Sequence, residues 1–435
     1  MFSPSRYIAI DDERSELVPL VEALHRIGAP CVGIHFDPPG LPEPSLFAGI
    51  RVLFTDLHLI KIAASPTQNY DAVAQIILTC VPADHGPYLL VLWTSHEEER
   101  QALADRLEVA LAEAPEKMPL AVLGLDKGRF RAGDGWNGPA LQDALREQVA
   151  GIPQLAALMS WERDVLAAAN ATLALVGGLV PSDQRTLGAY AGGLDRALSL
   201  LGLAAAGSAS ARGDPRAAVA SALAPVLADR IMNQGDPQNS AALWQRAVTF
   251  PQGGQLTATQ KASMHRVVHF AAPPAEAVER TDWGAVIPFG AEQREDAAML
   301  ARFGATETHL RSQEFKLKMT RVTDGRLVLV RGGAACDQAQ SNPGPMPMML
   351  GLLAPASALQ QGSRSAAVHS CPEQVLLPGD AEPSSLLVSA RFTSTMVPAD
   401  LVDWPDPILR IREQLLMTIL VHSATHSFRP GTLRF

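Results

Sequence analysis

Five polar residues in the first third of the chain have side chains suited to one kind of chemistry, and each lies at the end of a short apolar run. They are Asp11, Asp12, Asp56, Thr94 and Lys127. Carboxylates are the oxygen ligands that Mg²⁺ prefers, and a carboxylate held beside a cation can attack a phosphoryl group. An ammonium neutralises phosphoryl oxygens, and a hydroxyl can move toward a newly bound phosphoryl group. Together these residue types predict a phosphoaspartyl switch with Asp56 as the nucleophile.

The elements that must position these side chains can be read from the same stretch. Five strand-like runs alternate with helical patterns such as SELVPLVEALHRIG and NYDAVAQIILTCV; the runs are YIAI, CVGIHF, RVLFTD, YLLVLWTS and PLAVLGLDKG. Strands that alternate with helices predict an α/β domain, a doubly wound five-stranded parallel sheet covered by helices on both faces. In such sheets the ligand site lies at the carboxyl ends of the strands, so the five polar residues are expected to converge there.

The segments YIAIDDE, VLFTDLHL, YLLVLWTSH and VLGLDKG resemble the receiver domains of response regulators in two-component signalling. This resemblance covers residues 1–135 and implies a flavodoxin-like fold in which Asp56 is the phosphoacceptor. It also implies that Thr94 is the switch hydroxyl. Lys127 would pair with the acceptor or its phosphoryl group.

The same resemblance implies a Mg²⁺ ion as the cofactor. Asp12 and Asp56 would be direct ligands, Asp11 would act mainly through bound water, and the backbone carbonyl of His58 would supply another oxygen. The partner would be a histidine-kinase-like or other phosphodonor protein.

The sequence departs from the receiver pattern in several places. The intervals between Asp56, Thr94 and Lys127 are longer than usual for the family. Leu125 stands where an aromatic switch residue is usual, and Gly128 follows the lysine in place of proline. The usual relay from threonine to an aromatic side chain is therefore not expected in its common form. A pseudo-receiver, which keeps the fold for interaction and is not phosphorylated, remains an alternative.

The remainder of the chain changes character twice. Residues 136–250 show apolar side chains at three- and four-residue spacing and predict a helical middle region. Residues 251–435 contain short alternating runs between Gly- and Pro-bearing turns and predict a β-rich domain, with a small barrel as one arrangement. A final helix is expected over 406–428.

Other candidate sites in this remainder leave the question of a C-terminal effector enzyme open. Two histidine pairs have helical i, i+4 spacing, and a second group contains cysteines; these residues are His265, His269, His422 and His426, then Cys336, Asp337, His369 and Cys371. The pairs lack the glutamate of an HEXXH motif, and the cysteine group has an incomplete ligand set for zinc. Structural roles are the expectation for both groups.

Composition limits the class of protein. The chain has 435 residues, a net charge of −9 and 47% hydrophobic residues, which is ample for several packed cores. No basic stripe favours nucleic-acid binding, and no segment predicts a signal peptide or a membrane span. We expect a cytoplasmic signalling protein whose oligomeric state is open. Its domain combination resembles atypical prokaryotic signalling and phage-defence proteins.

Overall fold

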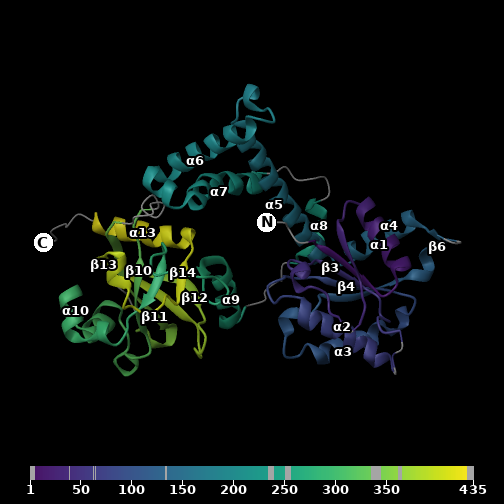
Figure 1. Ribbon diagram of the computed structural model, residues 1–435. Helices are drawn as coiled ribbons and strands as arrows, with labels where there is room; N and C mark the ends of the chain where they lie inside the picture. The colour runs from purple at the N-terminus through teal and green to yellow at the C-terminus, as the bar shows by residue number, and fades with distance from the viewer. Residues whose placement is uncertain are drawn as a thin grey trace. The chain divides into compact units, whose positions relative to one another are not determined.

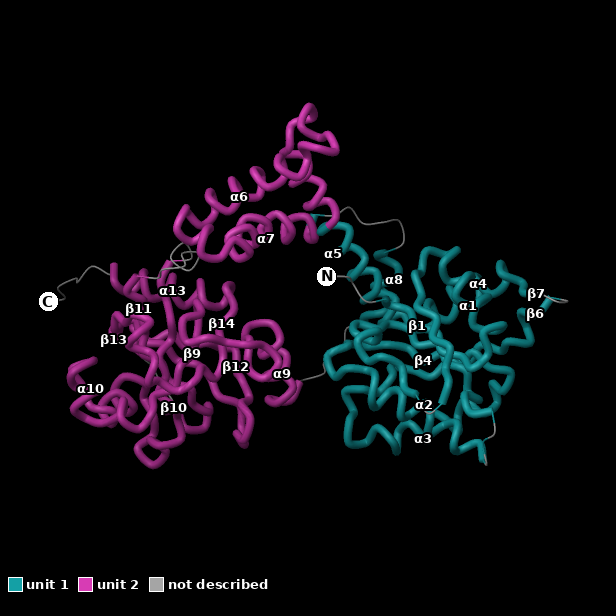
Figure 2. The backbone as a smooth tube through the Cα atoms, viewed as in Figure 1, with its two compact units in different colours: residues 1–169, 233–250 teal, residues 170–232, 251–435 magenta. Residues whose placement is uncertain are grey.

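The apolar runs of the first 130 residues form the strands of one sheet in the computed structural model. The structure describes residues 5–38, 40–61, 63, 65–132, 135–233, 240–249, 256–334, 344–360 and 365–428. The chain divides into two compact units (Figure 2): unit 1 comprises residues 1–169 and 233–250, and unit 2 comprises residues 170–232 and 251–435. The division into domains at residues 135 and 250 stays a prediction.

Unit 1 is built from alternating strands and helices. Its elements in chain order are β1 (Tyr7–Asp11), α1 (Arg14–Arg26), β2 (Cys31–His35), β3 (Val52–Thr55), α2 (Pro66–Cys80), β4 (Leu89–Thr94), α3 (Arg100–Ala110), β5 (Ala121–Asp126), β6 (Arg131–Ala132), β7 (Gly135–Trp136), α4 (Gly138–Ala150), the first part of α5 (Pro153–Gly178) and α8 (Ser240–Ala247). Strands β1 to β5 form an all-parallel sheet in the order β2-β1-β3-β4-β5.

Side-chain alternation explains why this sheet is covered on both faces. In β1, Ile8 and Ile10 join one hydrophobic core while Ala9 joins the other. The first core contains buried residues of α2 and α3, and the second contains buried residues of α1 and α4. Figure 1 shows the two helix pairs on opposite sides of the strands. A strand buried on both faces reads as a continuous apolar run, which is the pattern that made these strands recognisable.

Unit 2 combines helices with an antiparallel sheet. Its elements are α6 (Tyr190–Gly213), α7 (Pro215–Asn233, whose last residue falls in unit 1), α9 (Ala258–His269), β8 (Phe270–Ala271), β9 (Ala285–Pro288), α10 (Asp296–Phe303), α11 (Glu307–His309), β10 (Arg326–Arg331), β11 (Met346–Pro355), β12 (Val368–Val375), β13 (Ser384–Met396), β14 (Leu409–Ile411) and α13 (Glu413–Ser427). The seven strands follow the order β12-β13-β11-β10-β9-β14-β8 and curl into a half-barrel. The expected helical middle and β-rich C-terminal region are therefore present.

The expected start of the last helix was wrong. Residues 409–411 form strand β14, which pairs with both β8 and β9, and the helix begins at Glu413. Leu409 and Ile411 are buried while Arg410 between them is partly exposed, so this short segment has the two-residue period of a strand. Three residues are too few for that period to stand out from the helical pattern that follows.

Over the described part of the chain, no helix has both the length and the apolar character needed to cross a bilayer.

Candidate functional site

Four strands of unit 1 end at the same edge of the sheet with polar residues. Strand β1 ends at Asp11, β3 is followed by Asp56, β4 ends at Thr94, and β5 is followed by Lys127. Because the four strands are parallel neighbours, their carboxyl ends lie side by side. The strand order therefore brings the ends of these four strands to one edge of the sheet, as expected from the sequence.

Three carboxylates form the centre of this edge. Oxygen atoms of Asp11, Asp12 and Asp56 all lie within 4.8 Å of one another, and all three residues are buried. Local backbone geometry fixes two of them: the amide of Glu13 donates to Asp11 Oδ1 at 2.7 Å, and the amide of Leu57 donates to Asp56 Oδ1 at 2.7 Å. These contacts hold the first oxygen of each carboxylate, and the second oxygen of each lies near the ammonium of Lys127.

Burial and mutual repulsion raise proton affinity in this cluster. Burial raises the pKa of Asp11 to about 6, although Lys127 opposes the shift. The pKa of Asp12 is raised by burial and then by the negative charge of Asp56, with the ammonium of Lys61 opposing. Both pKa values are raised, which means that the ionised carboxylates are unfavourable in this cluster. A bound cation would stabilise them.

Lys127 supplies a buried positive charge next to the carboxylates. Its Nζ atom lies 2.8 Å from Asp11 Oδ2, 2.5 Å from Glu16 Oε2 and 3.4 Å from Asp56 Oδ2. Burial alone would lower the pKa of Lys127, but the charges of Asp56 and Asp11 and the hydrogen bonds to Asp11 and Glu16 raise it. The side chain is therefore an ammonium at neutral pH.

The donor set fits a hard divalent cation. The cluster offers carboxylate oxygens and no nitrogen or sulfur, which is the chemistry that Mg²⁺ selects. His58 follows Asp56 by two residues, and its side chain contacts Glu99. A role for the His58 backbone carbonyl as a further ligand stays a prediction, as does the identity of the ion.

Thr94 completes the set of predicted residues. It is almost fully buried at the end of β4, and its strand register pairs it with Asp126, next to Lys127. The backbone amide of His96 donates to Thr94 Oγ1 at 3.2 Å. In this contact the hydroxyl oxygen of Thr94 accepts the hydrogen bond, so its own proton can be donated to another group.

Two charged residues at this edge of the sheet, Glu16 and Lys61, were not predicted from the sequence. Glu16 holds Lys127 and also pairs with Arg131, and Lys61 lies 3.6 Å from Asp12 Oδ2. An acid in the first turn of a helix is common because it favours the helix dipole, so Glu16 gave no distinct signal. Lys61 lies in an irregular loop, where sequence gives no spatial placement.

The remaining candidates do not form comparable sites. Within the described residues, neither His265/His269 nor His422/His426 belongs to a group of three converging metal ligands. Cys371 is a free thiol, and burial raises its pKa to about 12. The candidates Cys336 and Asp337 lie outside the described residues.

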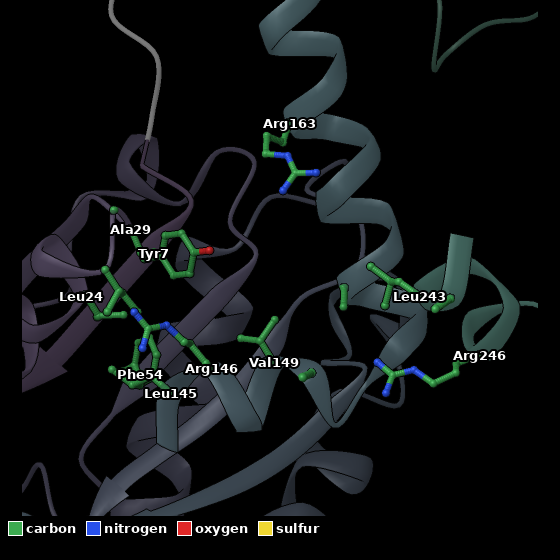
Figure 3. Close-up of a pocket in the computed structure, with 15 residues that line it drawn as sticks. Tyr7, Leu24, Ala29, Phe54, Leu145, Arg146, Val149, Arg163, Leu243 and Arg246 are labelled. Carbon is green, nitrogen blue, oxygen red and sulfur yellow. The ribbon is translucent and has the colours of Figure 1, made fainter. Parts of the chain in front are cut away.

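Unit 1 also contains a cavity of about 770 Å³ at a different place (Figure 3). Its lining includes Tyr7, apolar side chains of α1 and α4, and three arginines, Arg146, Arg163 and Arg246. Tyr7 begins β1 and Asp11 ends it, so the cavity extends from the opposite end of the strand. None of the residues predicted to form the phosphorylation site lines this cavity.

Comparison of the chain with protein-family models, curated proteins and solved structures finds no match in any of the three. The geometry of unit 1 and the sequence motifs therefore carry the functional argument.

Proposed function

We propose that the N-terminal region is a receiver domain of the response-regulator type, which accepts a phosphoryl group on Asp56. The observation that carries this proposal is the position of Lys127. Its ammonium lies 3.4 Å from Asp56 Oδ2, on the edge where three carboxylates converge. A structural ion pair would need only one carboxylate for one ammonium. Here three acids, Asp11, Glu16 and Asp56, surround a single lysine, and Asp12 adjoins two of them, which favours a site prepared for an additional cation.

The arrangement supports phosphoryl transfer in a direct way. An oxygen of Asp56 attacks the phosphorus of a donor, a new P–O bond forms, and the leaving group departs with the electron pair of the bond that breaks. Lys127 neutralises the phosphoryl oxygens, and Asp11 and Glu16 hold its ammonium in place. Asp11, Asp12 and Asp56 would hold Mg²⁺, which when bound neutralises charge on the acceptor and the phosphoryl group.

The strand order supports the flavodoxin-like class for this domain. The order β2-β1-β3-β4-β5 is one of the two common orders of doubly wound sheets, and ligands of such sheets bind at the carboxyl ends of the strands. The motifs that resemble receivers fall on β1, β3, β4 and β5, each in the position where that family carries its functional residues. The proposal rests on this agreement between motif and position.

We further propose that the phosphoryl group comes from a partner kinase and that the helical and β-rich remainder is the output region. The absence of a basic stripe in the sequence disfavours DNA binding as the output. Membership of a phage-defence or stress system remains part of the proposal and rests on the resemblance alone.

Phosphorylation can be tested on the full chain with small donors. We expect acetyl phosphate or phosphoramidate with Mg²⁺ to add the mass of one phosphoryl group to the parent protein and to Asp37→Asn, an exposed control. The Asp56→Asn variant should gain none. Beryllium trifluoride, which mimics a phosphoryl group on a carboxylate without transfer, provides a donor-independent check. If the protein gains no mass from the donors and also does not bind beryllium trifluoride, the pseudo-receiver alternative is favoured.

A further inference from the structure

A second group of metal-ligating side chains lies on the loops that follow β3 and β4. His58, His96 and Glu99 each offer a ligand atom, and these atoms lie within 4.8 Å of one another. His58 comes two residues after Asp56, and His96 comes two residues after Thr94. The group is separate from the acidic triad because it shares no side chain with it and contains two imidazoles.

The spacing of the donor atoms suits a tetrahedral cation. Ligands about 2.1 Å from a zinc ion at tetrahedral angles are about 3.4 Å from each other. Glu99 Oε1 lies 3.2 Å from His58 Nε2 and 4.0 Å from His96 Nδ1. Of these two distances the second must shorten, and the side chain of His96, which would have to move, is about half exposed.

A fourth donor is within reach on the same short turn. Glu98 Oε1 lies 3.5 Å from His96 Nδ1, and the Glu98 side chain is largely exposed. Two imidazoles and one or two carboxylates form the mixed nitrogen and oxygen set that zinc and its neighbours accept, whereas Mg²⁺ prefers oxygen alone. The two clusters therefore differ in the cation they would select.

Neighbouring contacts orient Glu99, while one histidine ring must turn. The rings of His58 and His96 stack with centroids 4.3 Å apart and planes only 4° from parallel. Because an imidazole binds a metal in its own ring plane, the half-exposed His96 must rotate out of this stack to share an ion with His58. The hydroxyl of Tyr70 donates to Glu99 Oε2 at 2.6 Å, which leaves Oε1 to face the histidines. Outer hydrogen bonds of this kind orient metal-ligating carboxylates in known sites.

We propose that His58, His96 and Glu99 form a binding site for a divalent transition cation of the zinc type, with Glu98 or water as the fourth ligand. The site ties the loop after β3 to the loop after β4. It does not depend on the proposed phosphorylation of Asp56, because no ligand belongs to the acidic triad.

The test is titration of the metal-free full chain with Zn²⁺ in the presence of excess Mg²⁺, which occupies oxygen-only sites. Parent protein is compared with His96→Ala, whose exposed side chain can be removed without disturbing the core, and with His309→Ala, an exposed control in unit 2. We expect the affinity of one Zn²⁺ equivalent to fall more than about tenfold in His96→Ala and to stay unchanged in the control.

Two further measurements separate a metal site from a simple ion pair of histidine and glutamate. Co²⁺ in place of Zn²⁺ should give a visible absorption band in the parent that His96→Ala loses. Tyr70→Phe should keep the stoichiometry and weaken Zn²⁺ binding by about 10- to 100-fold. Equal Zn²⁺ affinity and equal Co²⁺ spectra in the parent and His96→Ala would overturn the proposal.

Discussion

The Nζ atom of Lys127 lies 3.4 Å from Oδ2 of Asp56, within a group of acidic side chains that come from the end of β1, from α1 and from the end of β3. The lysine is almost fully buried, so this charge is not a solvated surface group. A buried ammonium with several carboxylate partners has a raised pKa and keeps its charge at neutral pH. In the proposed function this ammonium acts on a phosphoryl group at Asp56.

Lys127→Gln should strongly slow phosphorylation at Asp56 while the domain still folds. The substitution removes the charge that neutralises the phosphoryl oxygens, and we expect the initial rate of mass gain to fall by about a hundredfold or more. Lys61→Gln is the matched control, because Lys61 is exposed and 3.6 Å from Asp12. Lys61 is largely solvated and contacts Asp12 rather than Asp56, so the control should differ from the parent by less than about twofold. Equal rates in Lys127→Gln and the parent would contradict the role of this lysine.

Thr94 should be needed for the response to phosphorylation and not for the transfer itself. Thr94→Val keeps the shape of the buried side chain and removes the hydroxyl, whereas Thr94→Ser keeps the hydroxyl. We expect all three proteins to be phosphorylated. Hydrogen exchange in the loop after β4 should change on phosphorylation in the parent and in Thr94→Ser only. A phosphorylation-dependent change that persists in Thr94→Val would remove Thr94 from the switch.

Mg²⁺ should stabilise the parent protein through the acidic triad. A ligand that binds only the folded state adds about 2.7 kcal/mol to the free energy of unfolding at a concentration of roughly 100 times Kd. Asp12→Asn should lose most of this stabilisation, and the exposed control Asp37→Asn should retain it.

The same variant also reports on repulsion within the triad. Burial and the charge of Asp56 raise the pKa of Asp12, so its ionised form is unfavourable without a cation. Metal-free Asp12→Asn should therefore melt at a higher temperature than the metal-free parent. Thermal melts with EDTA and with Mg²⁺ measure both effects, and an unchanged Mg²⁺ shift in Asp12→Asn would contradict the proposed ligand.

Much of this site could be predicted because strands buried on both faces leave a clear mark in sequence. Runs such as VLFT and LLVLWT are continuously apolar, and their polar ends share one edge whenever the strands are parallel. The strand order could not be obtained in this way, because it depends on long-range pairing. Glu16 was missed because its position has an ordinary explanation at a helix start.

The C-terminal region was predicted only in outline. Its strands carry irregularities, such as the break in register between Met349 and Gly351 where β11 pairs with β13. Such bulges curl a sheet without leaving a period-two or helical signature in sequence. The β14 segment was assigned to the final helix for a different reason, since three alternating residues are a weak signal.

Cys371 should resist alkylation in the folded protein. It is 1% exposed, and burial raises the pKa of its thiol to about 12, so the reactive thiolate is scarce at pH 8. We expect iodoacetamide at pH 8 to modify Cys371 only after unfolding in urea, as read by peptide mass mapping. Rapid modification of the native protein would revive the alternative of a cysteine-dependent effector enzyme in the C-terminal half.

The most direct measurement of the central claim is identification of the residue that carries the phosphoryl group. The full chain is incubated with a phosphoryl donor and Mg²⁺, the acyl phosphate is reduced with borohydride, and the modified residue is located by peptide mass spectrometry. The account predicts reduction of a single residue, Asp56, and no labelling when EDTA replaces Mg²⁺. Modification at another residue, or unchanged labelling in EDTA, would contradict it.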